Sequence, residues 1–305
     1  MPLVTPLLAD GRIDERAVGR IVDRVVEAGC HPFVLGTTGE GASVGVAMGE
    51  TLVGQAVQCV AGRARVYAGI STNSLDFAAE TGRRYHELGA DVVVVHPPCY
   101  FEASGEGLRE YFERLADRLS GPMLLYNIPL TTRLSIPLDV VEALSHHPNI
   151  VGLKDSEGDR DRLRAGLERW GGRDDFAHLV GAAQDGAFGV ALGADGIVPG
   201  GANLTPSLHR RLYDAAMAGD SATAAELQET ADRLDSLYFH DRPLVDAIAA
   251  LKVLMAEAGL CEPHVLPPLT RLPAAEEARV REGWRAFSRE LVPASSSGGG
   301  RRRDG

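Results

Sequence analysis

Short polar motifs follow several apolar segments of this chain, at the places where each segment ends. They are Gly36-Thr37-Thr38-Gly39-Glu40-Gly41, His96-Pro97-Pro98-Cys99-Tyr100-Phe101, Tyr126-Asn127-Ile128-Pro129, Val151-Gly152-Leu153-Lys154-Asp155-Ser156 and Pro199-Gly200-Gly201-Ala202-Asn203. If the segments are parallel strands of a barrel, their carboxyl ends meet at the face that carries the active site. We therefore expect hydroxyl groups, phenols and one lysine to converge there.

Among these residues, Lys154 indicates one kind of chemistry most specifically. Only two of the 31 basic residues are lysines, Lys154 and Lys252, and the remaining 29 are arginines. A neutral lysine amine can attack a carbonyl carbon and form a Schiff base, which a guanidinium group cannot do. The protonated imine withdraws electrons from the neighbouring carbon, so C–C bonds form or break there. The alternative is that Lys154 merely pairs with an acid such as Asp155. For Lys252, in the late helical region, we expect an ordinary surface role.

Imine chemistry also needs a proton shuttle and a site for the substrate carboxylate. The phenol of Tyr126 can give and take a proton, although a tyrosine at a strand end can also serve only for packing. Gly36-Thr37-Thr38-Gly39 offers amides and two hydroxyl groups to a carboxylate, and no Gly-Lys-Ser/Thr follows it as in a Walker loop. The nine histidines have no metal-like spacing, so we predict no metal site and disfavour a metal-dependent aldolase.

The elements that must position these residues alternate along the chain. Runs such as Val92–Val95 are apolar on both faces, which is typical of a parallel sheet covered by helices. The expected strands are Leu3–Pro6, Phe33–Gly36, Val66–Ile70, Val92–Val95, Met123–Asn127, Ile150–Lys154, His178–Gly181 and Gly196–Pro199. Helices are expected over about 14–28, 46–60, 74–88, 106–119, 137–146, 159–170 and 184–192.

Eight strand–helix units predict an α/β fold, a (β/α)8 TIM barrel over residues 1–220 that carries the active site. A doubly wound open sheet is the alternative, but the plain turn Leu8-Ala9-Asp10-Gly11 replaces the glycine fingerprint expected after its first strand. Further helices over 205–219, 221–239, 243–258 and 274–290 indicate the last barrel helix and a C-terminal helical bundle over 221–292. The low-complexity segment 293–305 is expected to be a disordered tail.

Composition limits the classes of function. The chain has 305 residues, is 45% hydrophobic and carries a net charge of -11. This acidic balance argues against nucleic-acid binding, and the absence of a long uncharged apolar run argues against a membrane span. The N-terminal residues do not resemble a secretory signal. Four scattered cysteines without a Cys-x-x-Cys motif fit free thiols and a cytoplasmic location.

Taken together, the motifs resemble a known family. Gly36–Glu40, Tyr126–Pro129, Gly152–Asp155 and Gly193-Ala194-Asp195-Gly196 are similar in order and spacing to those of the dihydrodipicolinate synthase/N-acetylneuraminate lyase family of class I aldolases. The resemblance extends from the first strand to about residue 270. It implies a barrel with a C-terminal helical bundle, usually a homotetramer built as a dimer of dimers. It also implies action on pyruvate or a related 2-oxo acid through a lysine imine, without a metal or organic cofactor.

The resemblance assigns roles to individual residues. Lys154 matches the Schiff-base lysine, Tyr126 the acid/base, Thr37 the threonine that hydrogen-bonds this tyrosine, and Thr38 the residue that helps to hold the substrate carboxylate. Gly36 and Val198 join the substrate-binding set. Tyr100 matches the second member of a tyrosine pair that reaches into a neighbouring subunit's site, and Cys99 stands where the first tyrosine would be.

One departure bears on the second substrate. Synthases of the family have an arginine two residues after the proline of the Tyr-Asn-x-Pro motif, and here that position is Thr131, with Arg133 two residues later. We include both in the substrate-binding set. The sequence thus predicts a class I aldolase or lyase, acting on a substrate such as a 2-keto-3-deoxy sugar acid or a 4-hydroxy-2-oxo acid.

Several alternatives stay open. Within the family they are 4-hydroxy-tetrahydrodipicolinate (dihydrodipicolinate) synthase and a sugar-acid dehydratase that uses the same imine. Outside the family they are a catalytically idle barrel that binds a 2-oxo acid, and a phosphate-binding barrel isomerase, suggested by Pro199–Asn203.

Overall fold

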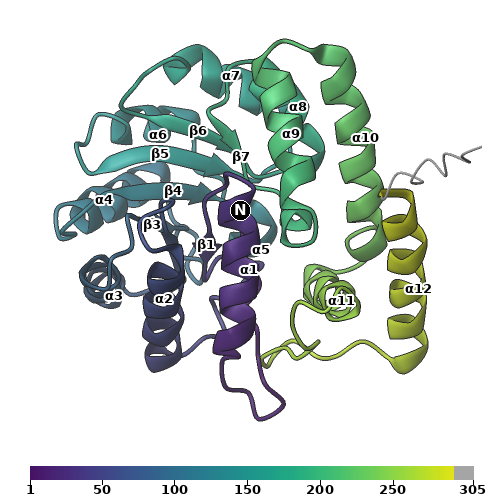
Figure 1. The fold of residues 1–305 in the computed structure, drawn as a ribbon. Helices are drawn as coiled ribbons and strands as arrows, with labels where there is room; N and C mark the ends of the chain where they lie inside the picture. The colour runs from purple at the N-terminus through teal and green to yellow at the C-terminus, as the bar shows by residue number, and fades with distance from the viewer. Residues whose placement is uncertain (292–305) are drawn as a thin grey trace, which may run out of the picture.

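The computed structural model describes residues 1–291 and has a curved sheet of seven parallel strands with helices packed around it (Figure 1). The strands lie in the sheet in chain order, because a helical crossover joins each strand to its neighbour. Their bounds are β1 Phe33–Val34, β2 Tyr67–Ile70, β3 Val92–Val95, β4 Met123–Asn127, β5 Ile150–Asp155, β6 Ala177–Val180 and β7 Gly196–Ile197.

Twelve α-helices and two short 3-10 helices occur among residues 1–291. The helices are α1 Glu15–Glu27, α2 Val46–Val60, α3 Leu75–Glu87, α4 Gly105–Ala116, α5 Pro129–Thr132, α6 Leu138–Leu144, α7 Arg160–Trp170, α8 Gly186–Ala191, α9 Pro206–Met217, α10 Ser221–Tyr238, α11 Leu244–Glu257 and α12 Ala274–Leu291, with η1 at Ala183–Asp185 and η2 at Gly200–Asn203. Short polar side chains accept a backbone N–H at the start of several of them and so fix where each helix begins. These caps are Asp14, Ser74, Ser104, Asp159 and Asp220.

The expected first strand, Leu3–Pro6, is not a strand in the structure. Pro2 makes a single parallel bridge to Phe33, and the Leu3 N–H donates to the Phe33 carbonyl at 2.8 Å. Prolines at positions 2 and 6 have no N–H to continue a ladder. The Val4 N–H instead donates to Asn203 Oδ1 at 3.0 Å, and Asn203 Nδ2 donates to the Pro2 carbonyl at 2.7 Å. A side chain from the segment after β7 therefore holds the N-terminal residues, so the sheet has seven strands and not the eight expected.

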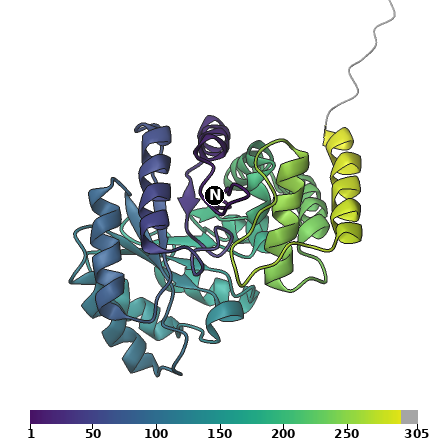
Figure 2. The ribbon, with the colours of Figure 1, turned by 90° about the horizontal axis from the view of Figure 1, so that it is seen from below.

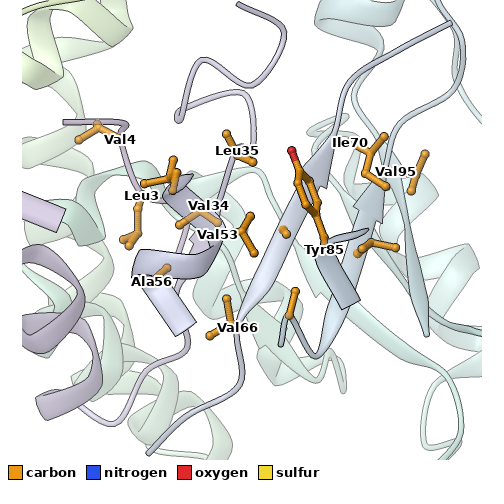
Figure 3. Close-up of a cluster of buried hydrophobic side chains, with 14 of the residues drawn as sticks. Leu3, Val4, Val34, Leu35, Val53, Ala56, Val66, Ile70, Tyr85 and Val95 are labelled. Carbon is orange, nitrogen blue, oxygen red and sulfur yellow. The ribbon is translucent and has the colours of Figure 1, made fainter. Parts of the chain in front are cut away.

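The prediction for Val92–Val95 is confirmed, because both faces of β3 are buried. Val93 and Val95 pack in the large cluster between the sheet and its helices, part of which is seen in Figure 3. Val92 and Val94 belong to a second cluster on the other face, with Phe33, Leu124, Tyr126, Ile128 and Val198. Burying one such valine stabilises the fold by roughly 1.5–3 kcal/mol. The second cluster surrounds the base of the predicted site.

The three C-terminal helices lie together on one side of the sheet and its helices (Figure 2). α10 packs against α8, α9, α11 and α12, and every residue of α11 from Ala247 to Met255 is buried. The expected helices after the last strand are therefore present, with no strand between them up to Leu291. Among residues 1–291, no helix has the length and apolar character needed to cross a membrane. The expected tail, 293–305, lies outside the described residues.

Candidate active site

A cavity of about 490 Å³ lies between the carboxyl ends of the strands and the C-terminal helices. Its strand-side wall contains five of the predicted site residues: Thr37, Thr38, Tyr126, Lys154 and Val198. Its opposite wall comes from the end of α10 and the start of α11, including Asp235, Tyr238 and Leu244. The structure thus brings these five residues together at the carboxyl ends of the strands.

A second cavity, of about 320 Å³, lies near the amino ends of the strands. It shares Lys154 and Val198 with the first cavity, and the other residues around it were not predicted to take part in chemistry. Only the carboxyl-end cavity combines the lysine with Tyr126 and the two threonines, so it is the candidate active site.

Lys154 faces aromatic rings and not an acid. β4 and β5 pair in a register that places Lys154 opposite Tyr126, and Lys154 Nζ lies 3.9 Å from the Tyr126 ring centroid and 5.1 Å from that of Phe33. The residue is 5% exposed. Among residues 1–291, no carboxylate oxygen lies within the 4.0 Å of Nζ that defines an ion pair. The amine is therefore held at the cavity wall by packing.

Asp155 has other partners, so the alternative that it pairs with Lys154 is wrong. Successive side chains of a strand point to opposite faces, and Asp155 Oδ2 accepts a hydrogen bond from Arg162 Nε at 2.7 Å. Its Oδ1 accepts from Asn127 Nδ2 at 3.0 Å. Glu157, which lines the cavity, joins this network: its Oε2 accepts from Asn127 at 2.8 Å and from Ser135 Oγ at 2.6 Å. This network was not foreseen, although the alternating acids after Lys154 were visible in the sequence.

The expected contact between Thr37 and Tyr126 is present. Thr37 Oγ1 and Tyr126 Oη lie 3.2 Å apart, and either hydroxyl group can be the donor. β1 ends after Val34 because Leu35 adopts a φ of 60°, and this left-handed turn leads the chain into the threonine loop. Tyr126 is 5% exposed as a residue and lines the cavity. The pair therefore presents a hydroxyl relay beside the lysine.

The same loop is anchored by a buried ion pair between Glu40 and Lys252. Neither side chain has any exposed surface. Lys252 Nζ also donates to the His264 carbonyl at 2.6 Å, and Glu40 Oε2 accepts the Leu266 N–H at 2.6 Å. Burial lowers the pKa of Lys252, and the Glu40 carboxylate opposes this shift. The surface role expected for Lys252 is wrong, because α11 carries it under the loop.

The structure does not bring four predicted residues to this cavity within one chain. Gly36 packs against Phe33, since a Cβ there would lie 2.8 Å from that ring. Tyr100 is 80% exposed. Thr131 and Arg133 are exposed at the short helix α5, and the Thr131 hydroxyl donates to the Ile128 carbonyl at 3.3 Å. None of these four is among the described residues that line the cavity.

Asp235 and Tyr238 form a cavity wall that was not predicted. Tyr238 Oη donates to Asp235 Oδ1 at 2.8 Å. Burial raises the pKa of Asp235 to about 7, with a further rise from the charge of Asp232, while the Tyr238 hydrogen bond opposes the shift. A Cβ at Gly200 would lie 2.8 Å from Tyr238 Oη, and one at Gly201 would lie 2.6 Å from Asp235 Oδ1. The two glycines therefore let α10 approach, which gives them a structural task.

Comparison with known proteins gives concordant results. Residues 1–284 match the model of the dihydrodipicolinate synthetase family. The chain is 34% identical over 278 residues to the 4-hydroxy-tetrahydrodipicolinate synthase of Phenylobacterium zucineum, covering 91% of this chain and 92% of the relative. It is 33% identical over 286 residues to the synthase of Thioalkalivibrio sulfidiphilus, covering 93% and 95%.

Two solved structures are similar over nearly the whole chain. The dihydrodipicolinate synthase of Aquifex aeolicus superposes with a TM-score of 0.86 and 30% identity, covering 94% of this chain and 97% of the other. YagE, a prophage protein of the dihydrodipicolinic acid synthase family from E. coli K12, was solved in complex with pyruvate. It gives a TM-score of 0.87 and 27% identity, with the same coverage.

Proposed function

Because the chain belongs to the dihydrodipicolinate synthetase family, we propose that it is a class I aldolase or lyase that binds pyruvate or a related 2-oxo acid as an imine on Lys154. The observation that carries this proposal is the cluster at one cavity wall. Lys154 Nζ lies 3.9 Å from the Tyr126 ring centroid, and Tyr126 Oη lies 3.2 Å from Thr37 Oγ1. A nucleophile and a proton relay thus share one cavity, as covalent catalysis requires.

The covalent step follows from these positions. Neutral Lys154 Nζ adds to the C2 carbonyl carbon of pyruvate and gives a carbinolamine. Tyr126 gives a proton to the carbinolamine hydroxyl, which leaves as water, and the iminium remains. Thr37 holds the phenol in position and can pass a proton to it. Thr38 and the amides of the same loop bind the substrate carboxylate.

Carbon–carbon bond formation follows from the iminium. Loss of a C3 proton gives an enamine, whose C3 adds to the carbonyl carbon of a second substrate. Water then hydrolyses the imine, releases the product and regenerates the amine of Lys154. The same steps in reverse cleave the bond.

The second substrate is best supported as a hydroxylated aldehyde, whose aldol with pyruvate is a 2-keto-3-deoxy sugar acid or another 4-hydroxy-2-oxo acid. No arginine occurs among the described residues around the cavity, while Glu157, Asp232 and Asp235 do. A second carboxylate would therefore lack the paired hydrogen bonds that a guanidinium group gives.

The second candidate is 4-hydroxy-tetrahydrodipicolinate synthase, which the names of the curated relatives favour. An assay with pyruvate and aspartate semialdehyde separates the two candidates. A sugar-acid dehydratase would start from the same imine and is distinguished by release of water without C–C cleavage. An idle binding protein would give no turnover with any of these compounds.

We also propose a domain organisation, an oligomeric state and a cellular location. A closed barrel over 1–220, joined through Asn203, with a helical extension over 221–292, is supported by the similarity to the Aquifex aeolicus structure. A homotetramer in which Tyr100 reaches a neighbouring subunit is supported by the exposure of Tyr100 and Phe101, 80% and 78%. A cytoplasmic location is supported by the four free cysteines.

Borohydride trapping tests the imine directly. Incubation with pyruvate and borohydride should add one pyruvate-derived group per chain, and peptide mass spectrometry should locate it on Lys154. If neither pyruvate nor any other 2-oxo acid gives an adduct, the proposed function is wrong.

A further inference from the structure

One wall of the cavity that contains Lys154 is formed by the carboxyl-terminal end of α10. Asp232, Asp235, Ser236 and Tyr238 of this helix line the cavity, followed by Phe239 and His240. Among the described residues around the cavity, Lys154 is the only lysine or arginine, and the proposed imine engages its nitrogen. The part of the cavity that receives the second substrate is therefore acidic.

Asp235 is held in one orientation in this wall. Its Oδ1 accepts the hydrogen bond from Tyr238 Oη at 2.8 Å, and Tyr238 itself is 6% exposed. The close approach to Gly200 and Gly201 leaves no room for a side chain under either group. The carboxyl group is consequently fixed before any ligand binds, which favours specific recognition.

The other oxygen of Asp235 is available to a ligand. Within residues 1–291, Oδ2 accepts no hydrogen bond, whereas Oδ1 accepts the one from Tyr238. Oδ2 is also absent from the unpartnered side-chain atoms that are completely buried in this part of the chain. It therefore has accessible surface, and Asp235 lines this cavity.

We propose that Asp235 is a specificity-determining residue that accepts a hydrogen bond from a hydroxyl group of the second substrate, so that an uncharged hydroxyaldehyde is preferred over an aldehyde bearing a carboxylate. This inference rests on the proposed imine function. A hydrogen-bond donor such as a substrate hydroxyl stabilises an ionised carboxyl group. Burial has already raised the pKa of Asp235 to about 7, so such a donor has a large effect on the fraction of Asp235 that is ionised. A carboxylate at the same place would be repelled by the ionised form.

The test compares two aldehydes of similar size at saturating pyruvate, D-glyceraldehyde and succinic semialdehyde. Wild-type protein should give the higher kcat/KM with D-glyceraldehyde. The measured quantity is the kcat/KM for D-glyceraldehyde divided by the kcat/KM for succinic semialdehyde. Asp235→Asn should lower this ratio by about 10-fold, and Asp235→Ala should lower it by about 10- to 100-fold, the range for losing a hydrogen bond to a charged group. Glu229→Gln removes an exposed carboxylate from the same helix outside the cavity and should leave the ratio within about 2-fold.

Trapping of pyruvate by borohydride is measured in every variant. If wild-type protein forms no adduct, the proposed function has failed. If the adduct forms in all variants but the ratio is unchanged in Asp235→Asn and Asp235→Ala, the inference about Asp235 is overturned and the imine function stands. Wild-type protein that forms the adduct but prefers succinic semialdehyde, or turns over neither aldehyde, also overturns it.

Discussion

Lys252 and Glu40 form an ion pair that is closed to solvent on both sides, and it joins helix α11 to the loop that carries Thr37. Removing one partner of a buried pair leaves the other charge without compensation, which costs about 3–5 kcal/mol. Lys252→Met should therefore lower the free energy of unfolding by about this amount, measured by urea denaturation. The double variant Glu40→Gln/Lys252→Met should recover a large part of the loss. If the double variant is as unstable as the sum of the two single variants, the pair does not act as a unit.

Lys154→Arg keeps a positive charge but removes the amine nucleophile. The pyruvate adduct formed with borohydride should disappear from this variant, as judged by intact mass. The matched control is Lys252→Arg, which changes the only other lysine and should keep the adduct. An adduct that persists in Lys154→Arg would move the imine to another amine.

Tyr126→Phe removes the phenolic oxygen and leaves the ring that packs on Lys154. We expect kcat to fall by roughly 10²–10⁴, the usual range for loss of a general acid or base, while circular dichroism stays unchanged. Thr37→Val should also lower kcat, because Tyr126 loses its hydrogen-bond partner, and Thr37→Ser should restore most of it. Near-normal turnover in Tyr126→Phe would mean that the phenol serves only for packing.

Arg133 is exposed and does not line the cavity within the described part of one chain. Arg133→Ala should therefore leave both the pyruvate adduct and kcat/KM within about 2-fold of wild type, as for most surface changes. A selective loss of activity with the second substrate would instead identify Arg133 as a carboxylate-binding residue.

Aspartate semialdehyde should be a poor second substrate for this site. Thr131 stands where the synthases have arginine, and a missing hydrogen bond to a charged group costs about 1.5–3 kcal/mol. We therefore expect kcat/KM for aspartate semialdehyde to lie one to two decades below that for hydroxylated aldehydes. Efficient condensation of pyruvate with aspartate semialdehyde would contradict this expectation and favour the synthase.

His178 should make stability fall in mild acid. Burial lowers its pKa to about 4, and its Nδ1 accepts a hydrogen bond from Trp170 Nε1 at 3.1 Å, which protonation would break. The unfolded chain, with a histidine pKa of about 6.5, then binds more protons than the folded chain between these two values, so stability is complete above about pH 6.5 and is lost as the pH falls towards 4.

Urea denaturation at pH 7 and pH 5 tests this. His178 should account for about 2 kcal/mol of the change in unfolding free energy, and His178→Gln should remove that share. Asp235, with a raised pKa, contributes in the opposite direction and is the same in both proteins. An identical pH dependence in wild type and His178→Gln would contradict the assignment.

Local pattern was sufficient to predict the strand-side wall of the site. Lys154 and Tyr126 each end an apolar strand, and parallel strands in chain order bring such ends together. The contact between Thr37 and Tyr126 followed from the family pattern and not from spacing. The prediction of a strand over Leu3–Pro6 was wrong because the prolines at positions 2 and 6 interrupt the ladder, and because the Val4 N–H is taken by Asn203, a distant residue that local pattern does not identify.

The opposite wall could not be predicted, since it depends on long-range packing. Helical periodicity in α11 indicates a helix but not that a distant loop covers Lys252 and supplies Glu40 to it. Asp235 looks like any acid of an amphipathic helix until α10 docks on Gly200 and Gly201. The positions of Thr131 and Arg133 depend on how the short helix α5 turns after β4, which residue spacing does not encode.

The burial of both lysines leaves the outer surface of the molecule without a single primary amine on a side chain. Reagents that acylate lysine, and cellular enzymes that acetylate or ubiquitinate it, find no target on that surface. Lys154 borders the two cavities described above, so a small lysine-directed probe would have to enter one of them to react with a side-chain amine of the unmodified protein. For the same reason, coupling the protein to a solid support through lysine would have to use Lys154 and would therefore inactivate the enzyme.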